Sequence, residues 1–207
     1  MKTFVYVDGF NLYFGCVKRT PNKWLNIRKL CETLLPRNQI ECIKYFTAKV
    51  SARAANPNAP VNQETFLRAL RTLPAFEIHF GHFLTHTVRM LLAHPVAGLP
   101  QYVEVIKTEE KGSDVNLATH LLNDAHLGRF EVAVVVSGDS DLLGPVKIVM
   151  NELKKTVGVL NPQQRTCRVL ATQATFYRHI RQGVLSTCLF PNTMTDANGT
   201  FTKPPNW

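Results

Sequence analysis

Two aspartates, Asp139 and Asp141, lie just beyond the short apolar run Val132-Ala-Val-Val-Val136 in this chain of 207 residues. An uninterrupted run of this kind is typical of a central strand of a parallel sheet, buried on both faces. In open parallel sheets, ligands bind beyond the carboxyl ends of the strands, which is where these two side chains are expected. Neighbouring carboxylates raise each other's pKa, so their spacing favours a bound cation.

Another acid, Asp8, ends the β-rich run 3–7 and is followed by Gly9 and Asn11. Asp8 can project over the edge of a sheet, and Gly9 lets the backbone turn sharply. Asn11 can form a hydrogen bond with a water on a metal ion or with a phosphate oxygen. The alternative is structural, with Asp8 and Asn11 serving only to cap a helix over about residues 11–18.

Asp114 precedes a helical pattern by one turn, on the inward face of the apolar stripe Ala118, Leu121, Leu122 and Ala125. A carboxylate in the first turn of a helix is favoured by the helix dipole, so Asp114 could be an ordinary N-terminal acid. The preceding Lys111-Gly112-Ser113 favours a site instead, because a glycine and a small polar residue allow the loop to come close to a ligand.

Strand and helix patterns alternate along the chain and would position these acids. Strands are expected at 42–48, 75–86 and 155–160, helices at 24–35, 62–73, after Asp141 and weakly at 173–180, and the arms of an inserted hairpin at 89–93 and 101–107. This alternation predicts right-handed crossovers and a three-layer α/β/α sandwich with a central, mostly parallel sheet. The four acids would then share one rim, which suits one or two Mg²⁺ or Mn²⁺ ions.

Length and composition indicate the domain organisation, the cellular location and the charge of a binding partner. The length suits a single domain, expected over 1–190, while Asn, Thr, Gly and Pro predict a loosely ordered tail over 191–207. No run approaches the roughly 20 apolar residues of a membrane span, and five scattered cysteines suit a reduced compartment, so a cytoplasmic location is expected. The net charge of +9 favours a polyanionic partner.

Three motifs occur in an order that resembles a known family: Val7-Asp-Gly-Phe-Asn-Leu12, Lys111-Gly-Ser-Asp-Val-Asn-Leu-Ala118 and Val136-Ser-Gly-Asp-Ser-Asp-Leu142. They are similar to those of the NYN domain family, in particular its LabA-like branch, within the PIN-like nuclease superfamily, over roughly residues 3–180. The resemblance implies metal-binding acids at Asp8, Asp114, Asp139 and Asp141, with Asn11 beside them and Ser137 in a supporting role. Leu142-Leu-Gly-Pro145 and Asn116 depart from the family pattern without removing an acid.

The leading hypothesis is a Mg²⁺- or Mn²⁺-dependent endoribonuclease in which a metal-activated water attacks an RNA phosphodiester. Basic side chains would hold the backbone of single-stranded or structured RNA, with Lys111 and Lys147 nearest the motifs and Arg68 and Arg71 farther away. DNA as a substrate and a homo-oligomeric state both remain open. The alternatives are an RNA-binding or scaffolding protein with an inactive site, and a Mg²⁺-dependent phosphatase, whose usual pattern is broken by Phe10.

His79, His82 and His86 suggest a metal site at first sight. Strand residues three apart point to opposite faces of a sheet, so His79 and His82 are expected to diverge. We therefore do not expect these histidines to form the site.

Overall fold

The structure, a computed structural model, describes residues 1–95, 98, 101–205 and 207. Its centre is a six-stranded sheet in the order β3-β2-β1-β6-β7-β8, in which all neighbouring strands pair in parallel. The strands are β1 (Lys2–Asp8), β2 (Gln39–Thr47), β3 (Phe76–Phe80), β6 (Val132–Val136), β7 (Thr156–Asn161) and β8 (Phe176–His179). The strand order reverses between β1 and β6, which creates the kind of switch point where α/β sheets bind ligands.

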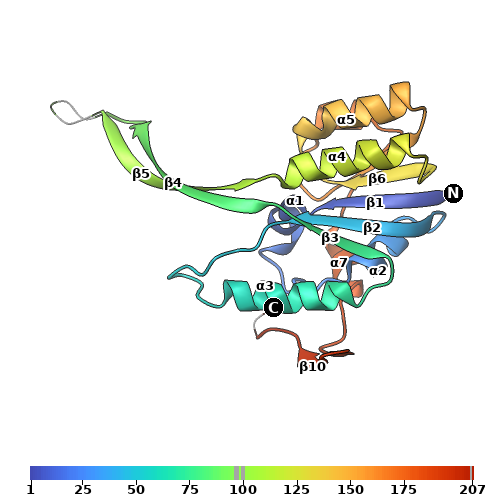
Figure 1. The fold of residues 1–207 in the computed structure, drawn as a ribbon, viewed down its shortest axis with the longest axis horizontal. Coiled ribbons are helices and arrows are strands. Elements are labelled where there is room, and N and C mark those ends of the chain that lie inside the picture. Colours follow the sequence, from blue (N-terminus) through green and yellow to red (C-terminus); the bar gives the residue numbers. More distant parts are fainter. Residues whose placement is uncertain (96–97, 99–100, 206) are drawn as a thin grey trace.

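Helices cover both faces of the sheet, so the predicted α/β/α sandwich is confirmed (Figure 1). One face packs against α2 (Ile27–Leu34), α3 (Ala59–Arg71) and α7 (Gln182–Thr187), and the other against α4 (Ser113–His126), α5 (Leu143–Lys147) and α6 (Arg168–Gln173). Every residue of β6 is buried, as its apolar run predicted, with alternate side chains entering the two cores. The remaining short helices are α1 (Gly9–Leu12), η1 (Tyr13–Val17), η2 (Ser140–Leu142) and η3 (Ile148–Glu152).

The inserted hairpin is longer than predicted. The expected strand 75–86 breaks at Gly81, and the chain then forms β4 (His82–Leu91), which pairs antiparallel with β5 (Tyr102–Lys111). A side chain at Gly81 would collide with the Glu110 side chain and the Lys111 carbonyl, so glycine permits this crossing of chains. Part of the predicted Pro/Gly loop between the arms lies outside the described residues.

The prediction of a helix over 173–180 was wrong. Helix α6 ends at Gln173, and Phe176–His179 form β8, which pairs with β7 at the edge of the sheet. Phe176 packs its ring against Gly158 of β7, a contact that depends on the missing side chain there. Tertiary pairing therefore outweighs the weak helical pattern, since aromatic residues fit a pleated surface well.

The C-terminal segment also differs from the expectation of a loosely ordered tail. Residues 193–202 form a hairpin of β9 (Thr193–Asp196) and β10 (Gly199–Thr202). Phe201 is buried against Trp24, and Arg68 of α3 forms a bidentate pair with Asp196. These side-chain contacts, which composition does not reveal, hold the hairpin on the α2–α3 side of the domain.

Within the described residues, no helix combines the length and apolar character needed to span a membrane. All five cysteines are free thiols, four of them buried.

Candidate active site

Asp8 ends β1 at the switch point, with only 4% of its surface exposed. One carboxylate oxygen accepts a hydrogen bond from the Asn11 backbone N–H at 2.9 Å, which caps helix α1. The other oxygen accepts from the Ser137 hydroxyl at 3.0 Å. Asp8 therefore combines the two roles that its sequence context suggested, capping a helix and standing at the edge of the sheet.

A short chain of hydrogen bonds joins the end of β1 to the end of β6. The Asn11 side-chain oxygen accepts from the Gly138 N–H at 2.9 Å, and the Ser137 hydroxyl accepts from the Asp139 N–H at 3.1 Å. Asp139 in turn accepts from the Asp141 N–H at 2.9 Å and caps η2. The local chain path of both motifs is thus fixed by side-chain bonds, and Asp139 and Asp141 stand at the more exposed rim.

Asp114 reaches the same rim from the first turn of α4. The helix begins after Gly112, whose φ of 95° lies in the left-handed region that favours glycine. Glu110 accepts hydrogen bonds from the Ser113 N–H at 3.0 Å and from its hydroxyl at 2.7 Å, and so anchors the start of this helix. Burial raises the pKa of Asp114, and the nearby Asp139, Glu110 and Asp141 carboxylates raise it further.

Electrostatics couple the four aspartates. Burial raises the pKa of Asp8 to about 6, although the hydrogen bonds from Asn11 and Ser137 oppose the shift, and Asp114 and Asp139 add to it. Across the described parts of the chain, none of the four acids forms an ion pair with a lysine, arginine or histidine. The rim therefore carries concentrated negative charge, which a cation would neutralise.

The donor chemistry suits a hard divalent cation, because all four side chains offer carboxylate oxygens. The described residues nevertheless contain no group of three or more His, Cys, Asp or Glu side chains close enough to hold a metal ion as they stand. Ion binding would therefore require the carboxylates to move closer together. Asp141 is exposed and Asp139 partly so, which leaves them room to do this.

The sequence of this chain matches a known domain family. The model of the NYN domain matches residues 2–180, which is most of the chain. The chain belongs to the NYN domain family. This family lies within the PIN-like superfamily, whose fold is associated with nucleases.

Two similar proteins were found. The chain is 29% identical over 236 aligned positions to 6-hydroxy-3-succinoylpyridine 3-monooxygenase HspA of Pseudomonas putida, covering 100% of this chain and 75% of that protein. It also resembles the crystal structure of VPA0982, a Vibrio parahaemolyticus protein of unknown function, with a TM-score of 0.57 and 18% identity over 87% of this chain and 93% of the other. The second likeness supports the fold alone.

Within the described residues, none of the four basic residues named from the sequence forms an ion pair with the four aspartates. Lys111 forms an ion pair with Glu109 at 3.4 Å, and Lys147 is exposed in the last turn of α5. The two arginines belong to α3, where Arg68 forms an ion pair with Asp196 and Arg71 forms one with Glu64. Both arginines are thus engaged with other acids, and the partner of Arg68 is so distant in the sequence that residue spacing does not predict the pair.

Aromatic residues lie within and just after the first motif, Val7–Leu12. Phe10 packs edge-on against Phe83 at the base of the hairpin, with ring centres 5.7 Å apart, and stacks with Phe14 at 6.5 Å. Phe14 is 58% exposed, and the Lys18 ammonium lies 4.7 Å from its ring centre. The row thus begins two residues after Asp8 and ends at an exposed ring beneath a positive charge.

Two polar residues at the end of β7 were missed by the sequence reasoning. Gln163 donates to the side-chain oxygen of Asn11 at 3.2 Å, and buried Asn161 accepts from the Gln163 N–H at 2.8 Å. Asn161 also fills the space where a side chain at Gly138 would lie. Asn161 and Gln163 follow the predicted strand 155–160, just as Asp8 and Asp139 follow predicted strands. The same pattern could therefore have identified them.

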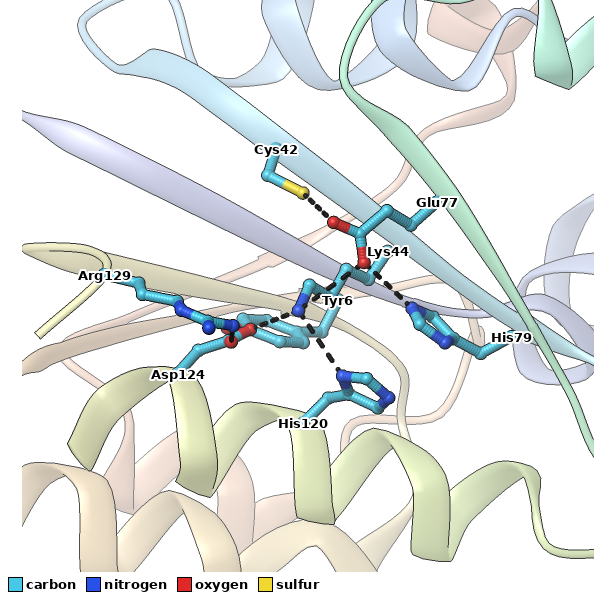
Figure 2. Close-up of polar contacts among 8 residues, drawn as sticks. All are labelled: Tyr6, Cys42, Lys44, Glu77, His79, His120, Asp124 and Arg129. Atoms are coloured by element: carbon cyan, nitrogen blue, oxygen red, sulfur yellow. Dashed lines mark hydrogen bonds and ion pairs between the residues drawn. The ribbon is translucent and has the colours of Figure 1, made fainter. Parts of the chain in front are cut away.

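A buried polar network below the rim holds α4 against the sheet (Figure 2). The Asp124 carboxylate, fully buried, accepts from Lys44 at 2.7 Å, Tyr6 at 2.8 Å and Arg129 at 2.8 Å. These contacts from β1, β2 and the chain beyond α4 lower the pKa of Asp124 despite its burial. Since Asp114 lies on the same helix, the network fixes the element that carries this acid.

In the described part of the chain, His79, His82 and His86 form no hydrogen bond or ion pair with the four aspartates. His79 forms a hydrogen bond with Glu77 at 3.1 Å, and its ring lies 4.0 Å from that of His120 (Figure 2). His82 and His86 belong to the next strand, β4.

Proposed function

We propose that this NYN domain is a metal-dependent endoribonuclease, which hydrolyses phosphodiester bonds at internal positions of an RNA strand. The observation that carries the proposal is the placement of Asp8, with a pKa raised to about 6, beside Asp114 and Asp139 at the switch point of the sheet. Such perturbed carboxylates at the ligand-binding edge of a parallel sheet are typical of functional sites.

The four aspartates would hold one or two Mg²⁺ or Mn²⁺ ions. When bound, such an ion supplies an activated water and neutralises charge on a phosphodiester. Ser137 and the Asn11 backbone orient the Asp8 carboxylate, and the Asn11 side chain, held by Gly138 and Gln163, ties the two strand ends together. Lys111 and Lys147 would contact the substrate backbone at longer range.

The substrate class follows from charge and exposed aromatic surface. The net charge of +9 favours a polyanion. An exposed ring such as Phe14 can stack on an unpaired base, whereas bases in a duplex are already stacked on one another. These features favour single-stranded nucleic acid, and the 2′-hydroxyl decides between RNA and DNA only if the site contacts it.

Two other functions each have one observation in their favour. An RNA-binding protein with an inactive site is favoured by one observation, that the acids are not gathered tightly enough to hold an ion in their present positions. A 6-hydroxy-3-succinoylpyridine 3-monooxygenase is suggested by the Pseudomonas putida relative HspA, which is similar over the whole of this chain.

The test is cleavage of end-labelled single-stranded RNA, matched DNA and duplex RNA with Mg²⁺, Mn²⁺ or EDTA. The proposal predicts internal cuts in single-stranded RNA that require the added metal. RNA binding without cleavage under any metal condition would support the inactive alternative. Oxygen-dependent loss of 6-hydroxy-3-succinoylpyridine in a parallel assay with a reductant, without RNA cleavage, would support the monooxygenase.

A further inference from the structure

The β4–β5 hairpin projects from the domain as an arm (Figure 1). Its strands are 10 residues each and pair without interruption from His82–Lys111 to Leu91–Tyr102. At the usual rise per residue, such a strand extends about 33 Å. We refer to residues 82–111 as the arm.

Both faces of the arm carry apolar side chains. Directly paired residues point to the same side, so the pairs Val88–Val105 and Met90–Val103 form one continuous apolar patch near the tip. Met90 is 47% exposed and Val103 38%. The opposite face presents Leu91, Tyr102 and Ile106, of which Ile106 is 79% exposed.

A ribbon of two strands has little stability of its own in water, because it needs a third strand or another element against its apolar face. Exposed apolar patches on a projecting element are typical of interaction sites. The pairing is nevertheless regular over its full length, which indicates that the sequence encodes this shape. A partner that covers an apolar patch would stabilise the arm, and the charge of the arm bears on which kind of partner fits.

The arm is electrically neutral in a strongly basic protein. It contains three basic residues and three acidic ones, so the net charge of +9 belongs to the rest of the chain. The acids and bases of the arm are Arg89, Lys107, Lys111, Glu104, Glu109 and Glu110. A neutral apolar surface is poorly suited to a polyanion, whereas two copies of the basic body repel each other except where the neutral arms meet.

We propose that the arm is the contact for a second copy of this chain, with the patch of Val88, Met90, Val103 and Val105 packed on the same patch of its partner. A contact of this kind is self-complementary about a two-fold axis, which is the usual symmetry of homodimers. On the face that carries the patch, Glu109 forms ion pairs with Lys107 and Lys111, so these charges are largely balanced within the arm and do not oppose the contact. Beside the patch, the Nδ1 atom of His86 is shielded from solvent and has no hydrogen-bond partner among the described residues.

The test is the molar mass of the full chain in solution, measured by sedimentation equilibrium up to about 0.1 mM, where weak dimers are populated. Wild type is expected to be a dimer. Met90→Glu places a charge in the patch and should weaken dimerisation by at least about 10-fold, because that charge would be buried without a partner. Leu91→Glu is the matched control, one residue away on the opposite face, and should leave the dimer intact.

A shortened arm tests the proposal independently of point charges. Joining Thr87 to Ile106, which face each other in the ladder, through Asn-Gly supplies a favoured hairpin turn. The deletion removes the whole patch of Val88, Met90, Val103 and Val105, and it also removes Leu91 and Tyr102 from the opposite face. This variant should be folded, as measured by circular dichroism. It should also be a monomer, as measured by sedimentation equilibrium. A monomeric wild type would overturn the proposal, as would a dimer that survives both Met90→Glu and the shortened arm, or one that Leu91→Glu disrupts equally.

Discussion

At the scale of single residues, the most informative group is the carboxylate of Asp8. Burial and the nearby acids raise its pKa from 3.8 to about 6, so the folded protein binds its proton more tightly than the unfolded chain does. The folded state therefore loses stability as the pH rises from about 4 to 6, and the full cost is present above that range. A cation bound beside Asp8 would offset this loss of folding stability, because it would balance the negative charge.

Asp8→Asn is expected to stabilise the metal-free protein at pH 7.5 by about 2 kcal/mol, because the amide carries no charge and its oxygen can still accept one of the two hydrogen bonds. Urea unfolding in EDTA measures the difference, which should shrink toward pH 4. Added Mg²⁺ should stabilise wild type and leave the variant unchanged. Equal stability of the two proteins at pH 7.5 would contradict this account of the site.

Phe14 is a second residue whose exposure is explained by the proposed function. Replacing it with leucine keeps apolar surface but removes the flat ring, so binding of single-stranded RNA should weaken about 10-fold through lost stacking. Phe14→Tyr keeps a ring and should bind like wild type. Fluorescence anisotropy in EDTA separates binding from cleavage, and an equal effect of both substitutions would argue against stacking.

At the scale of elements, α4 connects the site to the interior. Its start carries Asp114, and its later turns carry Asp124, which is bound to Lys44 of β2 and Tyr6 of β1. Lys44 is 3% exposed, so this ion pair is shielded from solvent. Loss of one partner would leave the other charge buried and only partly compensated.

Lys44→Met should therefore lower the free energy of unfolding by about 3 kcal/mol. Arg71→Met is the control, because it breaks the exposed pair with Glu64 and should cost at most about 1 kcal/mol. Both values come from urea titrations in the same buffer. A loss for Lys44→Met no larger than that of the control would show that the network does not hold α4 in place.

At the scale of the whole molecule, the sequence was sufficient for the layers and for the common edge of the acids. Apolar runs such as 132–136 mark central strands, and parallel strands bring their carboxyl ends together wherever they occur in the chain. The motifs around Asp8, Asp114 and Asp139 therefore predict a common rim from the sequence alone.

Other features depend on contacts between distant segments, which periodicity does not record. Phe176–His179 became a strand because β7 offered an edge, and the arm extends past the predicted hairpin because residues 82–88 pair with 105–111. Arg68 forms an ion pair with Asp196, which lies 128 residues away in the sequence. Glu110 and Gln163 join the site through hydrogen bonds that no short motif encodes.

The central claim, that the acidic rim performs metal-dependent RNA cleavage, is tested most directly by the cleavage rates of Asp139→Asn and Ser140→Ala beside wild type, in Mg²⁺ and in Mn²⁺. Asp139→Asn should lower the rate at least about 100-fold, because it weakens the metal's stabilisation of charge in the transition state. Ser140→Ala, at the exposed residue between the two acids, should cleave like wild type. A folded Asp139→Asn protein that cleaves at the wild-type rate would contradict the account.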